Sequence, residues 1–148
     1  MHLRLPAVCS IPILLLLAGC GGAGPDCASA DVRASVIKTV SGNIDNALVD
    51  YAVKKSDALK TKANAAKSEA DKSAILAKAK QSAVYRLSDT ITTNTKSKDK
   101  RTVTCSTTMF TTVEGIIAQK QVDFKVEQVP GGKSDVSVSP FQFDPSDD

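Results

Sequence analysis

The first regular pattern of apolar and polar positions along the chain is helical, and it runs from about residue 30 to residue 53. Large apolar residues recur at intervals of three or four positions, which places them on one side of an α-helix. They are Val32, Val36, Val40, Ile44, Leu48 and Tyr51. Ser29 precedes the pattern as a good N-cap residue, and Asp31 follows in the first turn, where a negative charge is favoured. We therefore predict an amphipathic helix over 30–53.

The charges on the polar face of this predicted helix help to distinguish a membrane-surface helix from one that packs on a protein core. A helix that lies on a membrane surface carries mainly basic residues on its polar face. Here Asp45 and Asp50 share that face with Arg33 and Lys38. The mixture of charges favours a helix that packs on a protein core, and a membrane-surface helix is the alternative.

Between residues 54 and 80 the apolar stripe becomes thin. Eight lysines face three acidic residues, and the positions that share one helical face are mostly alanines. Helix propensity is high for this composition, but methyl groups contribute little free energy on burial. We expect an Ala/Lys-rich helical segment that is exposed or loosely docked. Its lysines are either solvated or close to anionic head groups or the cell wall.

From Val84 onward the apolar period falls to two, which indicates strands. Tyr85, Leu87 and Ile91 alternate with polar residues, and three further alternating runs follow after the turns at 96–100, 114–115 and 130–132. Short connections of this kind join antiparallel neighbours, and the alternation gives the sheet one buried and one solvated face. The predicted inward residues of the last three runs are Val103, Cys105, Thr107, Met109, Val113, Val122, Phe124, Val126, Val136 and Val138.

Together these elements predict an α+β fold. It consists of an N-terminal amphipathic helix, an Ala/Lys-rich helix and a four-stranded antiparallel meander packed on the first helix. The order of elements resembles that of cystatin-like and nuclear-transport-factor-2-like folds, and of small bacterial lipoproteins of unknown function. This resemblance implies a long helix across a curved sheet and brings no activity. We place a single domain over 29–143 and an acidic tail over 144–148.

The N-terminus carries a different pattern, a short positive start followed by an apolar run. Arg4 precedes the run over 8–18, which ends in Leu17-Ala18-Gly19-Cys20. The run is too short to span a bilayer as a helix but is typical of a signal-peptide core. Small residues followed by cysteine complete the pattern, which resembles the lipobox of bacterial prolipoproteins.

This resemblance implies a signal peptide over 1–19, a diacylglycerol on Cys20 and a lipidated tether over 20–28. Gly21 follows the lipidation position, where members retained in the inner membrane carry aspartate. The chain therefore resembles the members that are sorted to the outer membrane and face the periplasm. The alternatives are an ordinary secretory signal that is cut elsewhere and an uncleaved anchor.

The processing implied by this resemblance leaves two cysteines. Cys9 leaves with the signal peptide and Cys20 takes the lipid, so Cys27 and Cys105 remain. In an oxidising compartment one remaining pair favours a disulfide, and two free thiols are the alternative. The spacing fits no zinc motif, and His2 is lost with the signal peptide. We expect a Cys27–Cys105 disulfide and no metal site.

The mature chain offers little for catalysis. Without His2 it has no imidazole to activate a nucleophile, and its acidic residues fall mainly in turns or on polar faces. Asp89 is the exception, because alternation places it on the inward face with Tyr85 and Ile91. It is either buried, with a raised pKa, or marks the end of the buried face. The formal net charge of +3 is too small to indicate nucleic-acid binding. We expect no catalytic residue and no cofactor.

Two functions remain open. The first is a lipid-anchored envelope protein that binds another envelope protein or a cell-wall component without catalysis. Its candidate surface is the polar face of the second predicted strand, made by Thr102, Thr104, Ser106 and Thr108. The alternative is a small hydrolase or ligand-carrying module with a pocket between helix and sheet. A filled helix–sheet interface favours the first function, and an open one lined by polar groups favours the second. The oligomeric state stays open.

Overall fold

The computed structural model describes residues 24–43 and 46–140. Within them the chain first forms four helices, which are α1 (Ala30–Ser41), α2 (Ala47–Lys55), α3 (Asp57–Asn64) and α4 (Glu69–Gln81). Four strands follow, β1 (Val84–Lys96), β2 (Thr102–Val113), β3 (Ile116–Gln128) and β4 (Ser134–Val138). Each strand pairs antiparallel with its chain neighbour, in the order β1-β2-β3-β4. The predicted α+β class and the four-stranded meander are confirmed.

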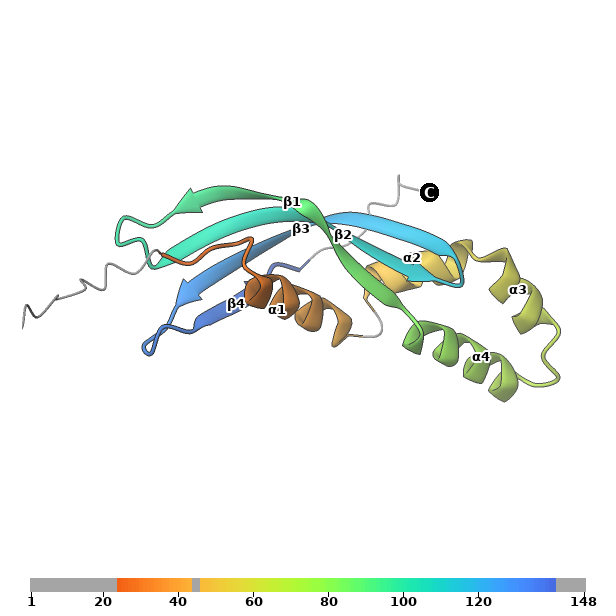
Figure 1. The fold of residues 1–148 in the computed structure, drawn as a ribbon. Coiled ribbons are helices and arrows are strands. Elements are labelled where there is room, and N and C mark those ends of the chain that lie inside the picture. The colour runs from red at the N-terminus through yellow and green to blue at the C-terminus, as the bar shows by residue number, and fades with distance from the viewer. Residues whose placement is uncertain (1–23, 44–45, 141–148) are drawn as a thin grey trace, which may run out of the picture.

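The strands form one curved sheet, and α1 and α2 lie on the same side of it (Figure 1). α1 contacts the two edge strands β4 and β1, whereas α2 contacts the central strands β2 and β3. The packing predicted for one helix is therefore shared by two. In the described part of the chain the opposite face of the sheet carries no helix, and we call it the outer face.

Strict alternation along β2 assigns its side chains to the two faces. Odd-numbered residues from Val103 to Val113 are buried against the helices, and even-numbered residues from Thr102 to Thr112 are partly exposed on the outer face. β3 pairs with β2 without a register shift, so the alternation continues across the centre of the sheet. The outward positions of β2 and β3 consequently form continuous rows.

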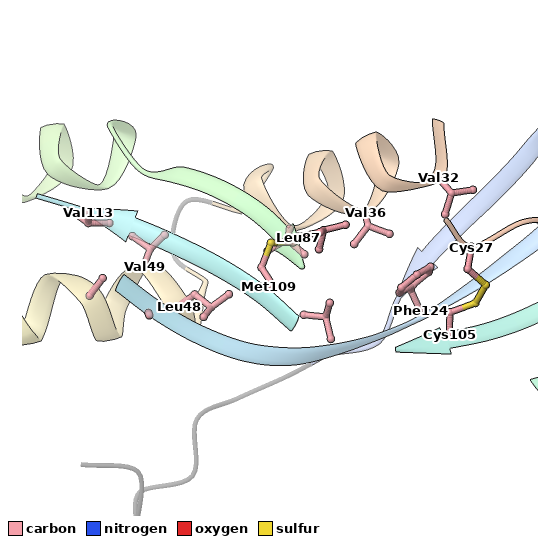
Figure 2. Close-up of a cluster of buried hydrophobic side chains, with 14 of the residues drawn as sticks. Cys27, Val32, Val36, Leu48, Val49, Leu87, Cys105, Met109, Val113 and Phe124 are labelled. Atoms are coloured by element: carbon pink, nitrogen blue, oxygen red, sulfur yellow. A yellow bond between two sulfur atoms is a disulfide. The ribbon is translucent and has the colours of Figure 1, made fainter. Parts of the chain in front are cut away.

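The core fills the space between the helices and the inner face of the sheet (Figure 2). Its buried side chains come from the four helices and from β1, β2 and β3, and each is almost completely buried. The largest fully buried ones include Phe124, Leu48, Leu59, Leu87, Met109, Val32, Val36 and Val49. Burial of each such side chain contributes roughly 1.5–3 kcal/mol to folding, so this cluster is the main source of stability.

The continuous helix predicted over 30–53 is wrong, because α1 ends at Ser41 and α2 begins at Ala47. Gly42 closes α1, with its N–H donating to the Lys38 carbonyl at 2.9 Å. The break allows α1 to lie against the sheet edges while α2 reaches the central strands. Ile44, which the prediction placed on the apolar stripe, lies outside the described residues.

Asn46 organises this break, because its buried side chain bonds to both helices. Its Oδ1 accepts from the Val49 N–H at 3.1 Å and caps the start of α2. Its Nδ2 donates to the carbonyls of Val40 and Asn43, at 3.2 and 2.7 Å, at the end of α1. Nδ2 also lies 2.9 Å from the Tyr85 hydroxyl on β1. One amide therefore ties two helix ends to the sheet.

The Ala/Lys-rich segment over 54–80 is also divided, into α3 and α4, which pack on each other and extend past the end of the sheet (Figure 1). The hydroxyls of Ser56 and Ser68 accept backbone N–H bonds at 3.2 and 3.1 Å and cap the two helices. Leu59 and Ala79 are buried in the main core. The expectation of an exposed or loosely docked segment is therefore wrong at these two positions.

Asp89 does not lie on the inward face, because the register of β1 against β2 shifts between Leu87 and Ile91. Its side chain is fully exposed. Arg33 of α1 donates to the carbonyls of Ser88 and Leu87, at 3.1 and 3.4 Å, and lies 3.8 Å from the Asp89 carboxylate. The two carbonyls at this irregularity of β1 therefore accept hydrogen bonds from α1.

Candidate functional site

The predicted interaction residues Thr102, Thr104, Ser106 and Thr108 lie together on the outer face of β2. All four are partly exposed, and their neighbours on β3 are the outward residues from Glu127 to Gln121. The structure therefore brings them onto one surface. Whether this surface binds a partner stays a prediction.

The middle of the outer face is a polar surface whose side chains bond to one another. The hydroxyls of Thr95 and Thr104 lie 2.6 Å apart across β1 and β2. The Ser106 hydroxyl donates to the Asn94 carbonyl oxygen at 3.2 Å. Cross-strand pairs of this kind stabilise a sheet, so these hydroxyls already have partners within the chain.

Residues that sequence reasoning missed lie at one end of the same face. Val84 and Ile117 are 65% and 63% exposed, although they are large apolar side chains. Val84 pairs with Thr112 and Thr112 pairs with Ile117, so the three form one row across β1, β2 and β3. Alternation in β3 could have indicated the outward position of Ile117, since Val122 and Phe124 fix the inward face.

The next row adds an aromatic ring and a cation. Arg86 pairs with Phe110, and its guanidinium carbon lies 4.4 Å from the centroid of the Phe110 ring, a cation–π geometry. We call Val84, Arg86, Phe110, Thr112 and Ile117 the outer apolar patch. Aromatic residues and arginine are enriched in protein-binding surfaces, and exposed apolar side chains that gather in a patch are typical of interaction sites.

On the helix side of the sheet, one surface cleft is bordered by α1, α4 and the start of β1. This cleft has a volume of about 400 Å³ and is lined by residues that include Ser41, Lys80 and Tyr85. Lys80 is paired with Asp50 at 2.9 Å. Burial raises the pKa of Tyr85, and the hydrogen bond from Asn46 opposes that rise. These polar groups are thus held by structural partners.

A second cleft of about 300 Å³ lies where α3 and α4 meet the turn between β2 and β3. Lys62 and Glu114 face each other there at 3.2 Å. The described residues contain no group of three or more His, Cys, Asp or Glu side chains that could hold a metal ion. They also contain one buried side-chain atom without a partner, the Thr111 hydroxyl. A lone hydroxyl has no base to activate it.

The two cysteines that the sequence pairs are brought together at the start of the domain. Cys27 precedes α1 and Cys105 lies on the inner face of β2, and both are buried. Their Cα atoms are 6.4 Å apart and their sulfur atoms are joined (Figure 2), which is consistent with the predicted disulfide. The link connects the segment before α1 to a central strand.

The described chain begins at the end of the sheet that is remote from the outer apolar patch. A Cβ on Gly24 would clash with the Lys100 carbonyl oxygen, so this position beside the β1–β2 turn requires glycine. Cys20 and the signal sequence over 1–19 lie outside the described residues. No described helix is long and apolar enough to cross a membrane.

Comparisons of the chain with protein-family models, with curated proteins and with solved structures found no match. The function is therefore inferred from the residues of this chain and their geometry.

Proposed function

We propose that the chain is a lipid-anchored protein of the bacterial cell envelope whose folded domain is a non-enzymatic binding module facing the periplasm. One observation carries the binding role. The inner face of the sheet is filled by the core, whereas the outer face carries no helix within the described residues (Figure 1) and ends in an apolar patch with an arginine. Exposed apolar side chains that gather on one face mark interaction sites.

The filled interior favours surface binding over the alternative of a hydrolase or ligand carrier. Such a module needs a cavity lined by converging polar groups. Here the positions between helices and sheet are taken by apolar side chains such as Leu48, Met109 and Phe124. The partner that fits the outer face is therefore a protein or cell-wall component that covers a surface.

The position of the proposed anchor supports a partner located away from the anchoring membrane. Cys20 is four residues from Gly24, which is at most about 14 Å of extended chain. Gly24 lies beside the β1–β2 turn, next to the start of β2. Thr112, in the outer apolar patch, is ten residues further along β2 than Thr102, which corresponds to about 33 Å of strand. An anchor at Cys20 therefore presents the patch at the membrane-distal end.

The lipid anchor is tested by replacing Cys20 with alanine. We expect the variant to take up no palmitate label and to accumulate as an uncut precursor or leave the membrane fraction. Without the thiol there is no atom to carry the diacylglycerol, and two or three acyl chains are what make such anchoring stable. Metabolic labelling followed by membrane fractionation measures both effects.

A Cys27→Ser variant is the matched control, because it also removes one thiol but leaves Cys20 in place. It is expected to keep the palmitate label. Equal labelling of the wild type and the Cys20→Ala variant would contradict lipid attachment at this residue.

A further inference from the structure

The end of the sheet at which the described chain begins is basic. The exposed lysines Lys96, Lys98 and Lys100 lie in and beside the β1–β2 turn, and the exposed Arg101 follows them. In the antiparallel meander the β3–β4 turn lies at the same end of the sheet (Figure 1). That turn carries the exposed Lys133. We call these five residues the basic end.

The lysines of the β1–β2 turn are not neutralised by neighbouring side chains. Lys96, Lys98 and Lys100 form no ion pair with any described carboxylate. The one acidic residue of the turn is Asp99, whose Oδ1 accepts from the Ser97 hydroxyl and, at 3.1 Å, from the N–H of residue 101. Residues 96–101 contain four basic residues and one acidic residue, a local formal charge of +3. A ligand that satisfies this charge is anionic.

The start of the described chain is fixed against this turn. Gly24 packs so closely on the Lys100 carbonyl that a Cβ would clash with it. Cys27, three residues further on, is bonded to Cys105 of β2. Two contacts therefore hold the segment before α1 at one place on the folded domain, and that place lies beside the basic end.

We propose that the basic end contacts the anionic phospholipid head groups of the membrane in which the chain is anchored. The inference rests on the proposed lipid anchor at Cys20 and deepens it. The four residues between this anchor and Gly24 span at most about 14 Å, so the basic end stays close to the bilayer surface. Each lysine or arginine next to an anionic surface strengthens binding by about fivefold, and acyl chains combined with a polybasic patch give stable attachment.

The lysines of α3 and α4 are the other basic surface, and the fold places them away from the anchor. These helices extend past the opposite end of the sheet (Figure 1), where Lys62 meets Glu114 of the β2–β3 turn at 3.2 Å. The 12 residues of β2 separate the two ends of the sheet, which is about 40 Å of strand. The Debye length at physiological salt is about 8 Å. Head groups at the anchor therefore attract the basic end and not the lysines of α3 and α4.

Lysine acylation read by mass spectrometry tests this contact in the mature lipidated chain. The chain is reconstituted into vesicles of equal parts phosphatidylcholine and phosphatidylglycerol, or of phosphatidylcholine alone. We expect Lys96, Lys98 and Lys100 to react at least about fivefold more slowly on the anionic vesicles, because contact covers the amines and favours their unreactive charged form. High salt is expected to remove the difference. Lys60 and Lys67, which are exposed in the α3–α4 region, are the internal reference and are expected to react equally on both.

A Lys98→Gln/Lys100→Gln variant is expected to lose most of the protection of the remaining Lys96. Lys60→Gln/Lys67→Gln removes the same charge elsewhere and is the matched control, which is expected to keep it. Equal labelling on both vesicle types, in a chain that floats with the vesicles, would overturn the contact but leave the anchor in place. Protection of Lys60 and Lys67 instead would also overturn it. A chain that floats with neither vesicle type would overturn the anchor together with the contact.

Discussion

Replacement of Val36 by aspartate is expected to abolish the cooperative thermal unfolding transition. Val36 is completely buried between α1 and the sheet, and no described basic residue belongs to the core cluster around it. An uncompensated buried charge costs about 3–5 kcal/mol, which is comparable with the total stability of many domains, about 5–15 kcal/mol. Circular dichroism during heating measures the loss.

Ala34→Asp is the matched control, because it introduces the same charge on the exposed side of α1. We expect it to unfold cooperatively, with a midpoint close to that of the wild type, since surface substitutions usually change stability by about 0.5 kcal/mol or less. Tolerance of Val36→Asp together with unfolding of Ala34→Asp would show that the buried face of α1 is assigned incorrectly.

Removal of the Cys27–Cys105 link is expected to have the second-largest effect. The two cysteines are 78 residues apart in sequence. A cross-link over that separation stabilises the folded state by about 4 kcal/mol in the chain-entropy account. A Cys27→Ser/Cys105→Ser variant is therefore expected to unfold at a markedly lower denaturant concentration than the oxidised wild type. Reduction of the wild type is expected to produce a similar shift.

Thiol alkylation provides the direct measurement of the link. In the mature protein without reductant, neither Cys27 nor Cys105 is expected to react while the chain is unfolded in denaturant. Stoichiometric alkylation of both under those conditions would show that the thiols are free and would remove the basis for the stability difference.

Most of the sheet was predictable from the sequence, because the alternation in β2 and β3 is local and uninterrupted. In β2 every second residue from Val103 to Val113 is buried, and turn residues such as Gly115 and Gly131 mark where the strands end. The β1 irregularity was not predictable. A register shift between Leu87 and Ile91 depends on pairing with β2, so alternation alone wrongly placed Asp89 on the inward face. Its full exposure agrees with the alternative that Asp89 marks the end of the buried face.

The helices were predicted in the correct region but with incorrect boundaries. Apolar spacing of three to four residues continues from Val40 to Leu48, and it conceals the break that Gly42 and Asn46 create. Serine at position 68 was a usable capping signal for the start of α4. Composition also led to an underestimate of how firmly the Ala/Lys-rich segment packs on the core. One buried side chain, Leu59, is enough to dock α3 there.

The candidate site was predicted in part. The threonine face of β2 follows from alternation alone, as Thr102 and Thr108 illustrate. The outer apolar patch requires the register, because Val84 and Ile117 become neighbours of Thr112 only when three strands are aligned. The high exposure of Val84 and Ile117 also depends on how the strands assemble. It therefore cannot be predicted from any short stretch of the sequence.

Photo-cross-linking from the outer face tests most directly whether the anchored domain binds a partner there. A photoreactive p-benzoylphenylalanine is placed at Val84, an exposed position at one end of the outer apolar patch. Ser73, which is exposed on α4, carries the same group as the control site. Ile117→Lys is combined with the Val84 probe, because a charge within the patch opposes apolar contact two strands away.

In intact cells the account predicts a discrete adduct from the Val84 site. That adduct is expected to be absent from the Ser73 site and reduced at least about tenfold by Ile117→Lys, the change expected when an apolar anchor worth roughly 1.5–3 kcal/mol is removed from an interface. An adduct pattern that is the same at Val84 and Ser73, or one at Val84 that Ile117→Lys leaves unchanged, would contradict binding through the outer face.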